Sequence, residues 1–316
     1  MHRTLLLGRR LARIPALAVI LSLAVMMAAT SPLAAQVPGC STAGFPRTVV
    51  DGLGNEILLP EPPQRIFSAV FAMDSILLAI ADPDRVVGVT VFSADPSQSA
   101  VADKVADHMV RIEHLSPEVV FAAQPDLVLT AFYSNPDAVT QIRNLGLPVY
   151  TFTGFNGLLD VLDNVERMGE ITGCEAAASA IIEQTYANYG RVAAKIASLP
   201  RPTVLSWNTW GNTTGTETTV HDIIQMAGGE NLAARHGISG WKEIDVEAII
   251  AMDPEVIITS DGDAFVQKLL NDPVLQSVTA VRTGRVYNLN HAIATDHHIF
   301  RAVEELAQHL HPEAFR

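Results

Sequence analysis

The residues with the clearest chemical potential are large aromatic side chains at the expected ends of strands. Short apolar segments alternate with stretches of helical spacing, and ligands of open α/β sheets bind beyond the carboxyl ends of the strands. The loops that follow these segments carry Phe71, Phe92, Phe132, Tyr133 and Phe155 in the first half and Trp207, Trp210 and Trp241 in the second. Such rings either bury a large flat ligand at small entropic cost or cap the core.

A histidine-rich segment near the C-terminus could ligate a metal. It contains His291, Asp296, His297 and His298, and imidazole and carboxylate groups suit iron, cobalt or zinc. The side chains of adjacent residues are expected to diverge, so His297 and His298 should not bind one ion together. Two interpretations stay open: His297 or His291 is an axial ligand of a chelated metal, or these histidines lie at the surface or at a helix start.

A polar segment from Trp207 to Thr219 follows one of the predicted strands. Its hydroxyl and amide groups could form hydrogen bonds with the rim of a ligand. The alternative is a hydrated loop in which Thr218 or Thr219 caps the next helix.

The elements that must position these residues indicate an α/β fold. Strands separated by helices of 10–15 residues form βαβ units, and dense apolar strands are expected where helices cover both faces of a parallel sheet. The predicted strands are 65–70, 86–91, 126–130, 149–152, 203–207, 255–260 and 285–289. We therefore expect two lobes, each with a mainly parallel sheet flanked by helices.

One long helix is predicted between the two sets of strands. Residues 175–199 contain no Pro and a single Gly, and their apolar residues recur at helical spacing. Thr172 and Glu175 are predicted to form a capping box at its start, and Pro200 stops it. About 25 residues span about 38 Å, which is enough to brace two domains. The expected organisation is an N-terminal lobe at 36–172, the bracing helix at 173–200 and a C-terminal lobe at 201–316.

The two halves share an internal similarity. Residues 115–130 align without gaps to residues 244–259, and this alignment pairs Glu118 with Glu247. Each copy reads as a short helix, a turn at Pro and a buried strand. A good capping residue begins each copy, Ser116 in the first and Asp245 in the second.

The N-terminus predicts export. Four arginines precede an apolar run from Pro15 to Ala29, and small residues follow at Ala34 and Ala35, which together indicate a signal peptide over 1–35. The run is shorter than the roughly 20 apolar residues of a membrane-spanning helix. The chain has 34 Asp and Glu against 21 Lys and Arg, and four of those basic residues lie in the leader. The acidic mature chain excludes nucleic-acid binding.

The chain has two cysteines, Cys40 and Cys174. In an oxidising compartment two cysteines favour a disulfide. The alternative is a lipoprotein box ending at Cys40, but Cys40 lies far beyond the apolar run, and Pro38 fits such a box poorly.

Taken together, the chain resembles the periplasmic binding proteins of the iron-siderophore, haem and vitamin B12 uptake family. The resemblance covers nearly all of the mature chain in family order. It lies in residues 49–55, 60–66, 85–90, 123–128, 145–150, 227–231 and 251–257. It implies a periplasmic and monomeric receptor, with no cofactor of its own, that binds a metal chelate between two lobes and delivers it to an ABC permease in the inner membrane.

The resemblance also implies roles for particular residues. Trp241 and Phe92 match positions of aromatic ligand contacts, and Phe132 lies one place from another. Glu118 and Glu247 match glutamates that dock on the permease, although Glu is favoured in any first helical turn.

The identity of the chelate stays open at this point. Arg111 and Arg301 are the nearest basic candidates for the cleft, and anionic ferric siderophores need several Arg residues. The scarcity of Arg residues favours a neutral or flat chelate such as a corrinoid. The family as a whole favours an iron complex, because most of its members carry one.

The alternatives are a free Zn²⁺ or Mn²⁺ receptor and a secreted metal-dependent hydrolase. The first needs three or four ligands spread over both lobes. Against the second, the chain has no His-Glu-x-x-His, Gly-x-Ser-x-Gly, P-loop or Gly-x-Gly-x-x-Gly motif.

Overall fold

The computed structural model describes residues 39–96, 98–289 and 297–316. The predicted signal peptide, residues 1–35, lies outside these ranges. In the part of the chain that is described, no helix combines the length and the apolar character that crossing a membrane requires.

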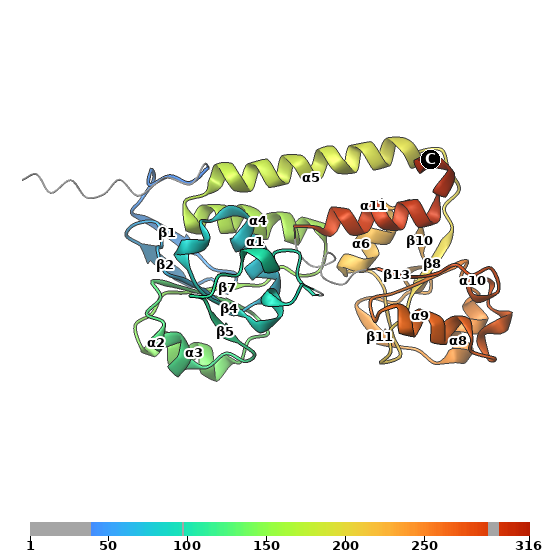
Figure 1. Cartoon of the computed structure of the whole chain (residues 1–316), viewed down its shortest axis with the longest axis horizontal. Coiled ribbons are helices and arrows are strands. Elements are labelled where there is room, and N and C mark those ends of the chain that lie inside the picture. The colour runs from blue at the N-terminus through green and yellow to red at the C-terminus, as the bar shows by residue number, and fades with distance from the viewer. Residues whose placement is uncertain (1–38, 97, 290–296) are drawn as a thin grey trace, which may run out of the picture. The chain divides into compact units, whose positions relative to one another are not determined.

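The first half forms a parallel sheet of five strands in the order β5-β4-β3-β6-β7. Figure 1 shows this sheet between helices above and below it. Its strands are β3 (Ile66–Ser68), β4 (Val86–Thr90), β5 (Val110–Ile112), β6 (Leu127–Ala131) and β7 (Val149–Phe152). An antiparallel hairpin of β1 (Arg47–Val50) and β2 (Glu56–Leu59) precedes it.

Helices cover both faces of this sheet. Because side chains alternate along a strand, Ile66 packs with α1 (Phe71–Ile80) and α4 (Leu158–Thr172), whereas Phe67 packs with α2 (Pro117–Ala122) and α3 (Pro136–Asn144). The two faces thus bury separate apolar clusters, which explains the uninterrupted apolar strands. Short 3-10 turns connect these elements: η1 (Pro83–Arg85), η2 (Val91–Ala94) and η3 (Ala102–Lys104).

The second half repeats this arrangement with a parallel sheet in the order β10-β8-β12-β13. Its strands are β8 (Thr203–Ser206), β10 (Glu230–Asn231), β12 (Val256–Thr259) and β13 (Val286–Asn288), and an antiparallel ribbon pairs β9 (Asn212–Thr214) with β11 (Trp241–Glu243). Its helices are α6 (Thr219–Met226), α7 (Leu232–Arg235), α8 (Val246–Met252), α9 (Asp263–Leu270), α10 (Thr279–Arg282) and α11 (Ile299–Leu310), with the 3-10 turns η4 (Leu275–Ser277) and η6 (Pro312–Phe315). The predicted α/β class with mainly parallel sheets is confirmed.

The predicted long helix is confirmed as α5 (Glu175–Ile196), which is 22 residues long. It takes part in both cores, because Ala178 packs with the cluster of the first sheet and Val192 with a cluster of the second. The strands on each side of α5 form separate sheets. The exact lobe boundaries stay a prediction.

The predicted capping box is wrong. Thr172 is the last residue of α4, and its hydroxyl donates to the Met168 carbonyl oxygen at 2.6 Å. The Thr172 hydroxyl is therefore already bonded within α4 and does not cap α5. Helix α5 begins after Cys174 without a side-chain cap.

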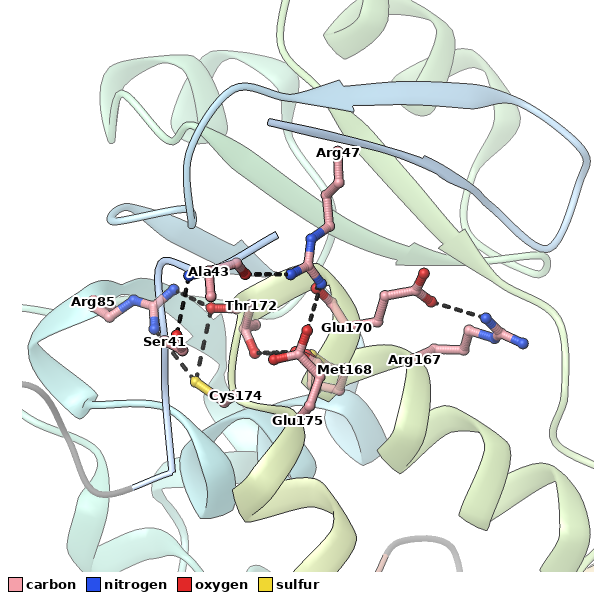
Figure 2. Close-up of polar contacts among 11 residues, drawn as sticks. Ser41, Ala43, Arg47, Arg85, Arg167, Met168, Glu170, Thr172, Cys174 and Glu175 are labelled. Atoms are coloured by element: carbon pink, nitrogen blue, oxygen red, sulfur yellow. Dashed lines mark hydrogen bonds and ion pairs between the residues drawn. The ribbon is translucent and has the colours of Figure 1, made fainter. Parts of the chain in front are cut away.

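Other contacts hold the junction between α4 and α5 in place of that cap (Figure 2). Arg85 donates to the Thr172 carbonyl oxygen at 2.8 Å. The Arg47 Nη1 atom donates to the Glu170 carbonyl oxygen at 2.7 Å and to Glu175 Oε1 at 2.6 Å. A disulfide joins Cys174 to Cys40. The start of α5 is thus tied to the N-terminal segment by one covalent bond and several charge-assisted hydrogen bonds.

Candidate functional site

The first group of site candidates lies where the strand order of the first sheet reverses. Strands β3 and β6 are neighbours, with β4 and β5 on one side and β7 on the other. Phe71 begins the helix that follows β3, and Phe132 and Tyr133 follow β6 directly. A crevice outside the carboxyl ends of strands at such a reversal is the usual ligand site of open α/β sheets.

Five aromatic residues make up what we call the first aromatic surface: Phe71, Phe92, Phe132, Tyr133 and Phe155. The Tyr133 ring packs edge-on against Phe132 and Phe155, with centroids 5.2 and 5.3 Å apart, and Phe92 packs edge-on against Phe71 at 6.2 Å. The exposed fractions of Phe92, Phe132 and Tyr133 are 40%, 55% and 61%. These three rings therefore do not serve merely to seal the core, and they leave apolar area for a ligand.

A buried carboxylate beneath this surface was not predicted from the sequence. Asp74, in the first turn of α1, is completely buried. Burial raises its pKa to about 6, against the opposing effect of the nearby Ser68, Ser93 and Thr90 hydroxyls and of the Thr90 amide. Desolvation, and then the negative charge of Asp74, raise the pKa of Tyr133. The charge of Asp74 thus acts on a residue of the first aromatic surface.

The second group lies around the reversal of the second sheet, between β8 and β12. Trp207 follows β8, and Trp241 begins β11 opposite Thr214 of β9. Both rings line a hollow whose described polar side chains are all uncharged: Ser206, Asn208, Asn212, Thr214, Thr219, Thr259 and Ser260. We call Trp207, Trp241 and this hollow the second aromatic surface.

The three tryptophans differ in their surroundings. Trp207 is half-buried and packs on Phe265 with centroids 6.1 Å apart, so it also caps the core. Its Nε1 atom is buried and has no hydrogen-bond partner among the described residues. Trp241 is 60% exposed, whereas Trp210 is 80% exposed and lies outside the described lining of the hollow.

Two hydroxyls of the polar segment, those of Thr214 and Thr218, already form hydrogen bonds within the protein. Thr218, rather than Thr219, caps α6 by accepting from the His221 amide at 3.1 Å. Thr214 forms a hydrogen bond with Ser206, and its carbonyl oxygen accepts from the Asn231 amide group at 3.0 Å. The capping interpretation is therefore confirmed for Thr218.

The histidine segment is only partly described. His291 and Asp296 lie outside the described residues. The rings of His297 and His298 lie beside each other, with centroids 3.9 Å apart, so the expectation that they diverge is wrong. The two residues occupy a turn before α11, where successive side chains do not alternate as they do in a strand. Within the described ranges, no three His, Cys, Asp or Glu residues form a metal-binding group.

The two basic candidates, Arg111 and Arg301, are outside the described lining of the second aromatic surface. Arg111 is on the edge strand β5 and pairs with Asp107 at 3.9 Å. Arg301 is in α11 and lines a hollow against α5, together with His297 and His298.

The two candidate docking glutamates occupy equivalent places in the two halves. Glu118 lies in the first turn of α2 and Glu247 in the first turn of α8, and both are exposed. Ser116 and Asp245 cap these helices, as predicted from the repeat. The Glu118 carboxylate accepts hydrogen bonds from its own backbone amide and from Ser116, which lower its pKa.

Comparison with known proteins identifies the family. A family described as periplasmic binding protein matches residues 71–292. An uncharacterised ABC transporter substrate-binding lipoprotein of Bacillus subtilis is 26% identical over 87% of this chain and 88% of its own length. A cobalamin-binding protein of Halobacterium salinarum is 29% identical over 86% of this chain and 77% of its own length. A periplasmic haem-binding protein of Pseudomonas aeruginosa is 26% identical, with a TM-score of 0.68 over 79% of this chain and 93% of that structure. Because the family match spans more than half of the sequence, the chain belongs to the periplasmic binding protein family, and it is a binding protein rather than an enzyme.

Proposed function

We propose that this protein is the exported receptor of an ABC importer and that it captures a cobalamin-type corrinoid between the first and second aromatic surfaces. The observation that carries the proposal is the collection of exposed rings at the strand-order reversals of both sheets. Rings from two sheets that meet across a groove would stack on both sides of a large flat ligand.

The surroundings of these rings favour a corrinoid over an anionic iron chelate. Among the described residues, no Arg or Lys lines the hollow of the second aromatic surface; Arg111 pairs with Asp107, and Arg301 lines the hollow against α5. A catecholate or carboxylate chelate needs paired positive charge. The described polar side chains that line the second aromatic surface are uncharged: the amides of Asn208 and Asn212 and the hydroxyls of Thr219, Thr259 and Ser260, besides the hydroxyls of Ser206 and Thr214, which bond to each other. These groups match the neutral amides around a corrin ring. The relative from Halobacterium salinarum is described as a cobalamin-binding protein, which agrees with this choice.

The cargo is tested by calorimetric titration of the mature protein with cyanocobalamin, haemin and a ferric catecholate siderophore. We expect cyanocobalamin to bind most tightly. A tighter complex with haemin or with the siderophore would refute the corrinoid and leave the receptor function in place. Binding of none of the three would refute the receptor function as proposed.

The site is tested with Trp241→Ala, because this exposed ring lines the hollow of the second aromatic surface. Loss of a stacking ring should weaken cyanocobalamin binding at least about tenfold. Tyr186→Ala is the matched control, since Tyr186 is a 54% exposed ring on α5, away from the strand ends. Equal affinities of the two variants would contradict the assignment.

We further propose that Glu118 and Glu247 dock on the permease. Both carboxylates are exposed and occupy equivalent helix starts in the two halves. Glu118→Gln with Glu247→Gln should reduce cellular uptake of radiolabelled cyanocobalamin at least about tenfold, a typical cost of losing charge pairs at an interface, while calorimetric affinity stays unchanged. Glu113→Gln, which alters an exposed glutamate just before α2, is the control. Unimpaired uptake by the double variant would exclude this docking role.

A further inference from the structure

One oxygen atom of Asp74 holds both ends of the turn that carries Phe92. The Oδ2 atom accepts hydrogen bonds from the Thr90 amide at 2.8 Å, from the Thr90 hydroxyl at 2.7 Å and from the Ser93 hydroxyl at 2.7 Å. Thr90 immediately precedes η2, and Ser93 lies within it. Ser93 and Thr90 are buried, whereas Phe92, between them, is exposed. The turn that carries the exposed Phe92 ring is therefore fixed by hydrogen bonds in the protein interior.

The same carboxylate belongs to the helix that provides the partner of Phe92. Phe71 is the first residue of α1, and Asp74 lies in its first turn. The Phe71 and Phe92 rings meet edge to face, with centroids 6.2 Å apart. Asp74 thus ties the helix that carries one ring to the turn that carries the other.

Burial of the Asp74 carboxylate lowers the free energy of unfolding, so a gain in stability does not explain why this residue is an acid. Burial raises its pKa, and no neighbouring cation contributes to the shift. Its Oδ1 atom has no hydrogen-bond partner among the described residues. A buried charge without a cation and with one oxygen unsatisfied destabilises a fold relative to a neutral side chain. Such a group calls for an explanation other than stability.

We propose that Asp74 is a positioning residue for cargo binding, which fixes η2 so that the Phe92 ring forms part of the first aromatic surface. The inference rests on the proposed function, because it requires Phe92 to contact the cargo. Asp74 itself is completely buried and does not touch the cargo.

The first test is a double-mutant cycle read by calorimetric titration with cyanocobalamin. Asp74→Asn keeps the shape of the side chain and removes its charge. We expect Asp74→Asn and Phe92→Ala each to weaken binding about tenfold, the order of one hydrogen bond to a charged group. The double variant should bind within about twofold of Phe92→Ala, because Asp74 acts through the ring that is already absent. Losses that multiply to about a hundredfold would overturn the proposal.

Two further variants separate positioning from general packing. Ser93→Ala removes one donor of the turn and should weaken binding about threefold, a fraction of the effect of Asp74→Asn. Ser75→Ala is the matched control, because Ser75 is buried next to Asp74 in α1 and its hydroxyl has no partner among the described residues. Its affinity should stay within about twofold of the unmodified protein. A loss equal to that of Asp74→Asn would overturn the proposal.

A readout without cargo keeps this inference separate from the choice of ligand. Hydrogen–deuterium exchange of the amides of residues 90–95 should be faster in Asp74→Asn than in the unmodified protein or in Ser75→Ala. If cyanocobalamin binds to none of the proteins, the proposed cargo fails, and the exchange comparison still decides the role of Asp74. Equal exchange in all three proteins would overturn that role.

Discussion

The burial of Asp74 makes a quantitative prediction about the pH dependence of stability. Burial raises its pKa from the ordinary 3.8 to about 6. The native protein therefore binds this proton more readily than the unfolded chain does. The resulting penalty is complete above pH 6, and it disappears as the pH falls toward 4.

The magnitude follows from the size of the shift. A difference of about 2 pKa units corresponds to about 3 kcal/mol at roughly 1.4 kcal/mol per unit. About 2 kcal/mol of this should be recovered between pH 7.5 and pH 4.5, since the unfolded-state pKa lies just below that range. The hydroxyls that face Asp74 from β3, β4 and η2, those of Ser68, Thr90 and Ser93, do not titrate in this range. The pKa of Tyr133 is raised above its ordinary value of 10.0, so Tyr133 does not titrate there either.

The assay is urea unfolding of the unmodified protein and of Asp74→Asn at several pH values, followed by circular dichroism. The other carboxylates of this acidic chain are common to both proteins, so the difference between the two free energies of unfolding isolates Asp74. We expect that difference to change by about 2 kcal/mol in favour of the unmodified protein from pH 7.5 to pH 4.5. A constant difference, or one that changes in the opposite direction, would refute the reasoning.

Three further predictions concern the frame that holds the site. Reduction of the disulfide between Cys40 and Cys174, which are 134 residues apart, should lower the free energy of urea unfolding by up to about 5 kcal/mol; an unchanged urea midpoint would contradict this. Gly190→Ala should raise the melting temperature by about 2–4 °C, because Gly190 lies within α5 and a Cβ atom there would meet nothing within 4 Å. Gly88→Ala should lower the free energy of unfolding by about 2 kcal/mol, since its Cβ atom would lie 2.3 Å from the buried Phe67 ring; calorimetric melting that ranks the two glycine variants the other way would contradict both expectations.

The sequence predicts most of the fold because the buried strands are dictated locally. The segment 86–91 consists almost entirely of β-branched residues, and it forms β4 at Val86–Thr90. The exposed β11 (Trp241–Glu243) was not predicted, since its three residues are exposed and their pairing depends on the distant β9. The long helix ends at Ile196 rather than at 199; beyond it the Leu199 amide donates to the Ile196 carbonyl oxygen at 3.0 Å, as in a tighter 3-10 turn before Pro200.

The exposure of several candidate site residues was predictable from the sequence, whereas the contacts that support them were not. The rule that ligands bind at the carboxyl ends of strands identified the loops of Phe132 and Trp241, and the structure exposes both rings. It could not indicate that Trp207 packs on Phe265. Asp74 was missed for a similar reason. An acid in a first helical turn is ordinary in sequence, and its burial depends on β4 and η2, which close over it.

The tryptophans of this chain all lie in its second half, so tryptophan fluorescence reports on that half. All three, Trp207, Trp210 and Trp241, follow α5 in the chain, and the aromatic residues of the first aromatic surface are phenylalanines and a tyrosine. Light absorbed selectively by indole therefore reports on the second sheet alone. Phe92→Trp would place a fourth indole on the first sheet, and the difference between the emission of this variant and that of the unmodified protein would report on the first half as cargo arrives.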